Sequence, residues 1–167
     1  AMDCPYVSGG DIFRELADEG DLSLNQQTAE ADTSDSIDWA LDNRLQSIAE
    51  KWGQADKAFI LESRLAGWLA GEHADLRLWL DAPEDVRLRR IEGRVETEAE
   101  MRVREVSEAG RYQAYYNIDV DDREFYDLHL NTARWSKDGV FQLVRAAIES
   151  YDPDADEGAF ETPPVEI

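Results

Sequence analysis

The sequence has 167 residues, of which 43% are hydrophobic, so we expect one folded domain with a sizeable core and exclude a disordered chain. Thirty-eight acidic residues face seventeen basic ones, and the net charge of −21 argues against non-specific binding to nucleic acid, because phosphate backbones are repelled. Only three of the basic residues are lysines, and an acid-rich, lysine-poor surface is typical of proteins from organisms that live in concentrated salt; an ordinary acidic protein is the alternative.

The first predicted element is a short strand at residues 5–7, followed by the turn Ser8-Gly9-Gly10-Asp11. Two glycines between a strand and an apolar-periodic run indicate a tight strand-to-helix turn, and we expect Asp11 to cap the helix. Residues 21–34 are polar and predict a short helix and a loop. A second helix is expected from Asp35 or Ser36 to near Gly53, and a buried strand at residues 58–61.

The second half of the chain continues the alternation of strands and helices. A strand is predicted at residues 76–80, and Pro83 fits the first turn of the helix after it. A long charged helix at about 96–116, exposed on most sides, is followed by a strand at 126–130 and a last amphipathic helix at 140–148. Residues 152–167 form an acidic tail that we expect to be flexible. The alternation predicts an α/β fold with a parallel sheet.

Two residue types exclude other classes of site. Cys4 is the single cysteine, so no disulfide framework or cysteine zinc site is expected, and His73 and His129 do not form a metal-binding motif. No run of about 18 apolar residues and no signal peptide is recognised, which favours a cytoplasmic protein without a membrane span.

Arginines follow three of the four predicted strands, as Arg14, Arg64 and Arg134. Ligands of open parallel sheets bind beyond the carboxyl ends of the strands, and guanidinium groups grip phosphate bidentately, so this placement suits an anionic ligand. Ion pairs with the abundant acids are the alternative explanation. A segment at about 86–116 that is rich in arginine and poor in core residues indicates a lid over phosphates, or else a solvated helix with Glu–Arg pairs.

Five motifs occur in one order: SGGDIFR at 8–14, ESRLAGW at 62–68, WLDAP at 79–83, SEAGRY at 107–112 and NTARW at 131–135. Together they resemble the archaeal type of cytidylate kinase, from a haloarchaeal source, over residues 5–135. The resemblance implies a three-layer P-loop NTPase-type parallel sheet with helices on both faces. It also implies a kinase domain over residues 1–151 that transfers the γ-phosphoryl group of ATP to CMP or dCMP with Mg²⁺, as a monomer.

The same resemblance implies a role for each of eleven residues. The acceptor nucleotide is expected at Ser8, Asp11, Arg14, Arg64 and Glu108, with Arg14 and Arg64 on its phosphate. The transferred phosphoryl group is expected at Arg94, Arg104 and Arg111, and the ATP base near Asn131, Thr132 and Arg134.

One element of the family pattern is not found in this sequence. These kinases open with a strand and a glycine-rich loop, G-x-x-G-x-G-K-[ST], whose backbone N–H groups and lysine hold phosphates. Gly9-Gly10 is followed by Asp11 and belongs to the acceptor side. We therefore expect the central first strand and the P-loop to be missing before Ala1, which predicts a slot in the sheet and little activity.

Two alternatives remain open. The chain can be a kinase for another nucleoside monophosphate or a small hydroxyl compound, because spacing does not identify the base. It can also be a non-catalytic acidic interaction domain that retains only the acceptor half.

Overall fold

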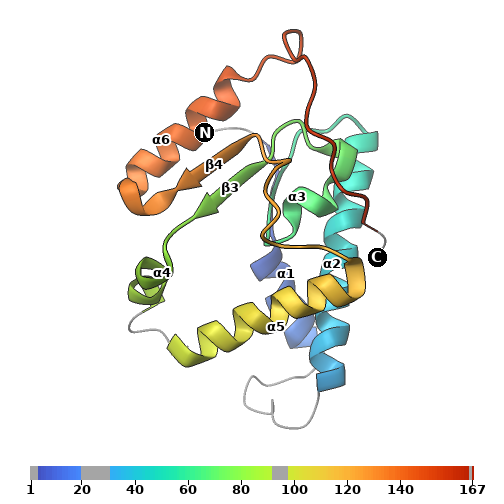
Figure 1. The fold of residues 1–167 in the computed structure, drawn as a ribbon. Coiled ribbons are helices and arrows are strands. Elements are labelled where there is room, and N and C mark those ends of the chain that lie inside the picture. The colour runs from blue at the N-terminus through green and yellow to red at the C-terminus, as the bar shows by residue number, and fades with distance from the viewer. Residues whose placement is uncertain (1–3, 20–30, 92–97, 166) are drawn as a thin grey trace. The chain divides into compact units, whose positions relative to one another are not determined.

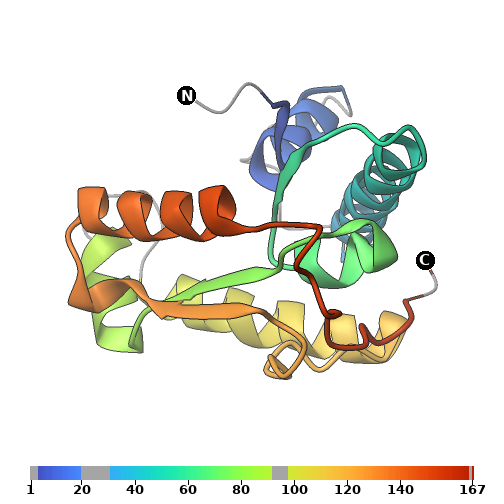
Figure 2. The same ribbon diagram turned by 90° about the horizontal axis from the view of Figure 1, so that it is seen from above.

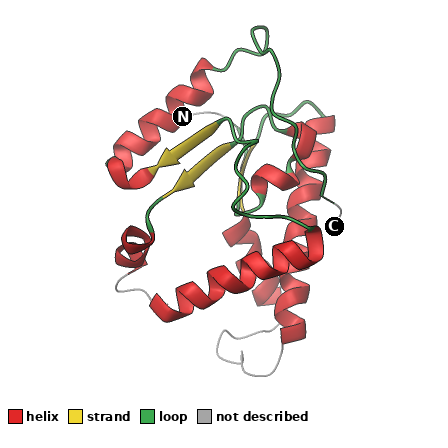
Figure 3. Ribbon diagram, in the orientation of Figure 1, coloured by secondary structure: helices red, strands yellow, loops and turns green. Residues whose placement is uncertain are grey.

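The computed structural model describes residues 4–19, 31–91, 98–165 and 167. They fall into two compact units, one of Ala1–Ala74 with Thr162–Ile167 and the other of Asp75–Glu161. Each unit contains one pair of parallel strands and several helices (Figure 1, Figure 3). The predicted α/β fold with parallel strands is confirmed at this level.

The first unit is built around strands β1 (Tyr6–Ser8) and β2 (Ile60–Glu62). They pair in parallel, with Ser8 opposite Glu62 at the carboxyl end of both strands. The helices of this unit are α1 (Gly9–Glu19), α2 (Ala31–Gln54), α3 (Ala66–Leu69) and the 3₁₀ helix η1 (Gly71–His73). Its most deeply buried large side chains are Leu45 of α2 and Leu65, which are 0% and 1% exposed. Burial of these apolar side chains stabilises the unit that carries the β1–β2 edge.

The second unit is built around strands β3 (Leu78–Asp81) and β4 (Leu128–Asn131). They also pair in parallel, and Asp81 lies opposite Asn131 at their carboxyl ends. The helices of this unit are α4 (Glu84–Ile91), α5 (Glu98–Tyr116), the 3₁₀ helix η2 (Thr132–Arg134) and α6 (Lys137–Ser150). Figure 2 shows the β3–β4 pair between α6 and α5, so helices lie on both sides of these strands.

The bounds of several helices differ from the prediction. Helix α1 begins at Gly9, so Asp11 lies in its first turn and is not its cap. Helix α2 begins at Ala31, before Asp35 and Ser36, because polar residues do not stop a helix that packs on only one side. The last helix begins at Lys137, where the Ser136 side chain accepts a hydrogen bond from the backbone N–H of Gly139.

The strands also differ by one or two residues. Asp127 was expected within a strand, but its side chain accepts a 2.7 Å hydrogen bond from the backbone N–H of Arg77. The β3–β4 ladder therefore begins at the next residue of each strand, Leu78 and Leu128. On the long helix α5, Val103 and Val106 are exposed as expected, but Met101, Tyr112 and Tyr116 are buried, so its apolar residues are not all at the surface.

The four described strands form two separate pairs, and no ladder joins β1 or β2 to β3 or β4. A single continuous sheet is therefore not present among them. Residues 152–165 contain no helix or strand. They make local hydrogen bonds, such as Tyr151 to Asp156, and the Gln46 side chain donates to the carbonyl of Val165 at 3.4 Å. The flexibility of this tail stays a prediction, as does the kinase domain over 1–151.

Candidate functional site

The carboxyl ends of β1 and β2 bring two of the sequence motifs together. Gly9 follows β1 directly, and a Cβ at this position would lie only 2.8 Å from Cβ of Ser63. A glycine is required here because any side chain would push the first turn of α1 away from the loop after β2. The motifs at 8–14 and 62–68 therefore share one edge of the first unit.

Hydroxyl groups and a carboxylate meet at this edge. Ser8 donates a 2.8 Å hydrogen bond from its hydroxyl to Oε2 of Glu62, and the Tyr6 hydroxyl donates to the same oxygen at 3.3 Å. Arg14 forms an ion pair with Asp11 one turn away on α1, and both side chains are exposed. A Cβ at Gly10 would lie 3.5 Å from Nη1 of Arg14 and 3.6 Å from Oγ of Ser8, so these groups line one surface.

Arg64 follows the same edge from the β2 side. It lies two residues after the last residue of β2 and its side chain is exposed. Four of the residues expected at the acceptor are thus in the first unit, close to the carboxyl ends of one strand pair: Ser8, Asp11, Arg14 and Arg64. Sequence reasoning missed Glu62, although it lies inside a quoted motif and ends a strand.

A network of charged groups surrounds Asp81 at the end of β3. Its Oδ2 accepts a 2.9 Å hydrogen bond from Arg123 and lies 3.8 Å from Nε2 of His129, and its Oδ1 lies 3.7 Å from Arg87. Arg87 also binds Glu105 of α5 at 3.0 Å. This one carboxylate therefore connects β3, β4, α4 and the loop that carries Arg123.

Arg123 was not found by sequence reasoning, because it belongs to none of the quoted motifs. Its guanidinium carbon lies 4.7 Å from the centre of the Trp79 ring, and its side chain is 27% exposed. Stacking on an indole and pairing with a carboxylate fix the position of this guanidinium. Only the fold brings it beside Asp81, which lies 42 residues earlier in the chain.

The turn after β4 holds the residues expected near the ATP base. The Asn131 side chain caps the turn by accepting a hydrogen bond from the backbone N–H of Ala133 at 3.0 Å. The Thr132 hydroxyl donates to the carbonyl of Asp81 at 2.8 Å and accepts from Nη1 of Arg90 at 2.8 Å. Nη2 of Arg90 donates to the carbonyl of Thr132 at 3.1 Å. Two of the three predicted side chains thus shape the turn, and Arg134 is exposed beside them.

The expected phosphoryl-contacting residues lie on or before α5. Arg104 is exposed, and Arg111 is half-buried with its guanidinium carbon 5.3 Å from the centre of the Tyr112 ring. Glu108, expected at the acceptor, is half-buried on the same helix and so lies in the second unit. Arg94 and the middle of the predicted lid lie outside the described residues.

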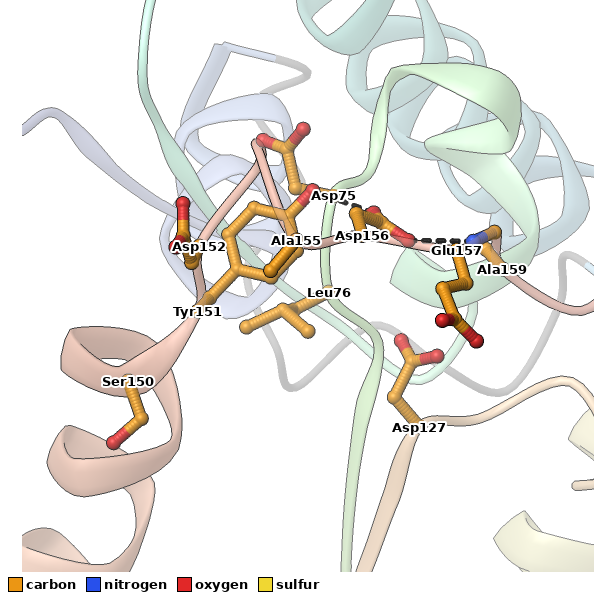
Figure 4. A pocket seen from close by; sticks show the side chains of 11 residues that line it. Asp75, Leu76, Asp127, Ser150, Tyr151, Asp152, Ala155, Asp156, Glu157 and Ala159 are labelled. Atoms are coloured by element: carbon orange, nitrogen blue, oxygen red, sulfur yellow. Dashed lines mark hydrogen bonds between the residues drawn. The ribbon is translucent and has the colours of Figure 1, made fainter.

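A cavity of about 450 Å³ lies at the opposite end of the second unit's strands, beside Tyr151 (Figure 4). The charged residues that line it are all acidic: Asp75, Asp127, Asp152, Asp156 and Glu157. The hydrogen bond to Asp156 raises the pKa of Tyr151 to about 12. The backbone N–H of Gly158, followed by the Tyr151 hydroxyl, lowers the pKa of Asp156. No arginine or lysine lines this cavity, so it does not suit a phosphate.

Metal and membrane sites were also sought. Within residues 4–19, 31–91 and 98–165, no group of three or more His, Cys, Asp and Glu side chains is arranged to hold a metal ion. None of the described helices is long and apolar enough to cross a membrane.

Known proteins match this chain over most of its length. A family model described as an AAA domain matches residues 1–113. A cytidylate kinase of Haloquadratum walsbyi is 51% identical over 160 residues, which are 93% of this chain and 81% of that protein. The chain belongs to the cytidylate kinase family. A cytidylate kinase of Natronomonas pharaonis is 50% identical over 158 residues, and one of Pyrococcus horikoshii is 42% identical over 159, each covering 92% of this chain and 80% of the relative.

The family assignment confirms the resemblance drawn from the five motifs. The two relatives at 50–51% identity come from Haloquadratum and Natronomonas, and this agrees with the acid-rich, lysine-poor composition expected of a halophile. The individual roles of the site residues stay predictions.

Proposed function

We propose that this member of the cytidylate kinase family transfers the γ-phosphoryl group of ATP to CMP or dCMP, giving CDP or dCDP. The observation that carries the proposal is the shared edge of two paired parallel strands, where Ser8 ends β1, Arg14 follows β1 and Arg64 follows β2. That edge is where open α/β folds bind their ligands. Its exposed guanidinium groups suit the phosphate of a monophosphate.

In this proposal Arg14 and Arg64 hold the CMP phosphate. Asp11, now paired with Arg14, keeps the guanidinium near the edge until phosphate competes for it. Because CMP supplies the attacking phosphate oxygen and ADP leaves through its β-phosphate oxygen, the reaction needs in-line positioning and charge neutralisation, and no covalent intermediate. Arg94, Arg104 and Arg111 are proposed to neutralise the transferred group, with Glu108 near the acceptor.

The donor side is proposed to lie at the turn after β4. The side chains of Asn131 and Thr132 are engaged within the protein, so their proposed role is to shape the turn, and Arg134 with the turn's backbone is left to meet the base. No described cluster suits a metal ion, and we assign Mg²⁺ to no residue.

The printed sequence contains no G-x-x-G-x-G-K-[ST] loop. We propose that phosphoryl transfer needs a phosphate-holding loop of this kind, that the fold is a three-layer P-loop NTPase sheet, and that the enzyme is a cytoplasmic monomer.

The test is a coupled assay of the protein with CMP, dCMP, UMP and AMP. CMP or dCMP is expected to be the preferred acceptor, and Arg64→Ala is expected to lower kcat/KM for CMP by about 10³-fold. Arg145→Ala is a matched control, because among the described residues Arg145 has a local ion pair, with Glu149 one turn along α6, and both side chains are about half exposed. Preference for another monophosphate would favour the other kinase, and absence of any transfer would favour a binding domain.

A further inference from the structure

The C-terminal segment, here residues 162–165, belongs to the first unit. It contains no helix or strand, yet part of it is covered by other residues. Thr162 and Val165 are half-buried, and Oγ1 of Thr162 is buried without a hydrogen-bond partner among the described residues. Nε2 of Gln46 on α2 donates a 3.4 Å hydrogen bond to the carbonyl of Val165, which lies 119 residues later in the chain. The segment is therefore docked on α2.

The order Thr-Pro-Pro-Val accounts for which residues of this segment are buried. Two consecutive prolines fix their φ angles and favour the extended polyproline II conformation, in which residues three apart face the same side. This agrees with the half-buried Thr162 and Val165 on either side of the exposed Pro163 and Pro164. A segment that is already extended loses little conformational entropy when it docks.

Three consecutive residues of α2 connect the C-terminal segment with the edge of β1 and β2. Leu45 is 0% exposed, and its Cδ1 lies 3.6 Å from the position that a Cβ at Gly9 would take. Arg44 forms a 3.4 Å ion pair with Glu15 of α1. Successive residues of an α-helix point in different directions around its axis, so one turn of α2 contacts α1, the start of α1 and, through Gln46, the C-terminal segment.

We propose that the C-terminal segment is a clasp on α2 that positions the acceptor edge. Holding Gln46 fixes the turn of α2 that packs on Gly9, and Gly9 begins the helix that carries Arg14. The inference rests on the proposed function, since it takes the β1–β2 edge as the acceptor site. Gln46 and the segment are positioning elements in this scheme, because they act on the acceptor only through α2 and α1.

The decisive variant replaces both prolines of the segment with glycine. Because Pro163 and Pro164 are exposed, Pro163→Gly/Pro164→Gly removes no buried side chain, but it makes the undocked segment more flexible and so weakens docking. Pro153→Gly, at another exposed proline after α6, is the matched control. Gln46→Ala removes the hydrogen-bond donor by an independent route and keeps a good helix former in α2, and Ser47→Ala at the exposed neighbouring position is its control.

Hydrogen exchange and steady-state kinetics give two separate readouts. The backbone amides of α2 around Gln46 and of the first turns of α1 are expected to exchange about 2- to 10-fold faster in both variants, as the loss of about one hydrogen bond implies. KM for CMP is expected to rise by the same factor, while KM for ATP and kcat stay unchanged. Both control variants are expected to match the wild type in all of these measurements.

Three results would overturn the clasp. Unchanged exchange in α2 would show that the segment does not hold this helix. Faster exchange with an unchanged KM for CMP would remove its positioning role, and an equal rise of both KM values would assign it to general stability. If the wild-type protein does not bind CMP, the proposed function fails, whereas the exchange rates of α1 and α2 still decide whether the segment holds them.

Discussion

Replacing Asp81 with asparagine tests whether one carboxylate secures the end of β3. Asn retains an acceptor for the 2.7 Å hydrogen bond from the backbone N–H of Ala82. It removes the charge that faces Arg123 at 2.9 Å and Arg87 at 3.7 Å. The Asp81 side chain is 28% exposed and those of the two arginines 27% and 36%, so water screens these pairs only in part.

The expected loss lies between the two limits for ion pairs. An exposed pair contributes about 0–1 kcal/mol, and breaking a buried pair costs about 3–5 kcal/mol. In the variant Arg87 keeps its ion pair with Glu105, and Arg123 keeps its stacking on Trp79 and its 3.3 Å ion pair with Asp121. Nε of Arg123 is already buried without a hydrogen-bond partner among the described residues, so losing Asp81 leaves this guanidinium less satisfied. We therefore expect Asp81→Asn to lower the free energy of unfolding by about 1–3 kcal/mol.

Urea unfolding at one fixed, high salt concentration measures this loss. In 1 M salt the Debye length is about 3 Å, so ion pairs between exposed side chains are screened more than the partly buried pairs of Asp81. Asp85→Asn is the matched control. Asp85 pairs with Arg89 at 2.8 Å, but both side chains are more than 60% exposed, and the loss is expected to stay within about 0.5 kcal/mol. If both variants lose the same amount, the network around Asp81 does not stabilise the second unit as described.

Three further predictions concern single contacts. Ser136→Ala removes the cap of α6 and is expected to cost about 1 kcal/mol in urea unfolding, whereas Ser136→Thr should cost less; equal losses would contradict a capping role. Gly53→Ala places a Cβ 2.6 Å from Cβ of His73 and is expected to cost about 1–3 kcal/mol, and a neutral result would show that His73 moves freely. Tyr151, with its pKa raised to about 12, should stay neutral in an absorbance titration up to that pH, so its hydrogen bond stabilises the fold below pH 10 and is lost between pH 10 and about 12. Tyr151→Phe should remove this late transition and raise the pKa of Asp156, measured by NMR; an unchanged Asp156 would disprove the bond.

Sequence reasoning singled out the two arginines near the β1–β2 edge but missed the carboxylates at the ends of β2 and β3. Arg14 and Arg64 were found because they follow predicted strands, and both lie close to the β1–β2 edge. Glu62 and Asp81 were quoted within motifs but given no role. In the structure they are the last residues of β2 and β3, and their side chains accept hydrogen bonds there. The backbone of a strand's last residue can pair with the neighbouring strand while its side chain lies at the edge where ligands bind. An error of one or two residues in the predicted strand end therefore hides such a side chain.

The order of elements, the parallel pairing and the family could be determined from the linear pattern, because hydrophobic periodicity and short motifs are local properties of the chain. The partners of each charged group could not be determined in this way. Arg123 reaches Asp81 across 42 residues, and Ser8 reaches Glu62 across 54, through ladders whose register only tertiary packing sets. With 38 acids available to 17 basic residues, composition leaves many pairings possible, and the fold selects among them by bringing particular groups within hydrogen-bond distance.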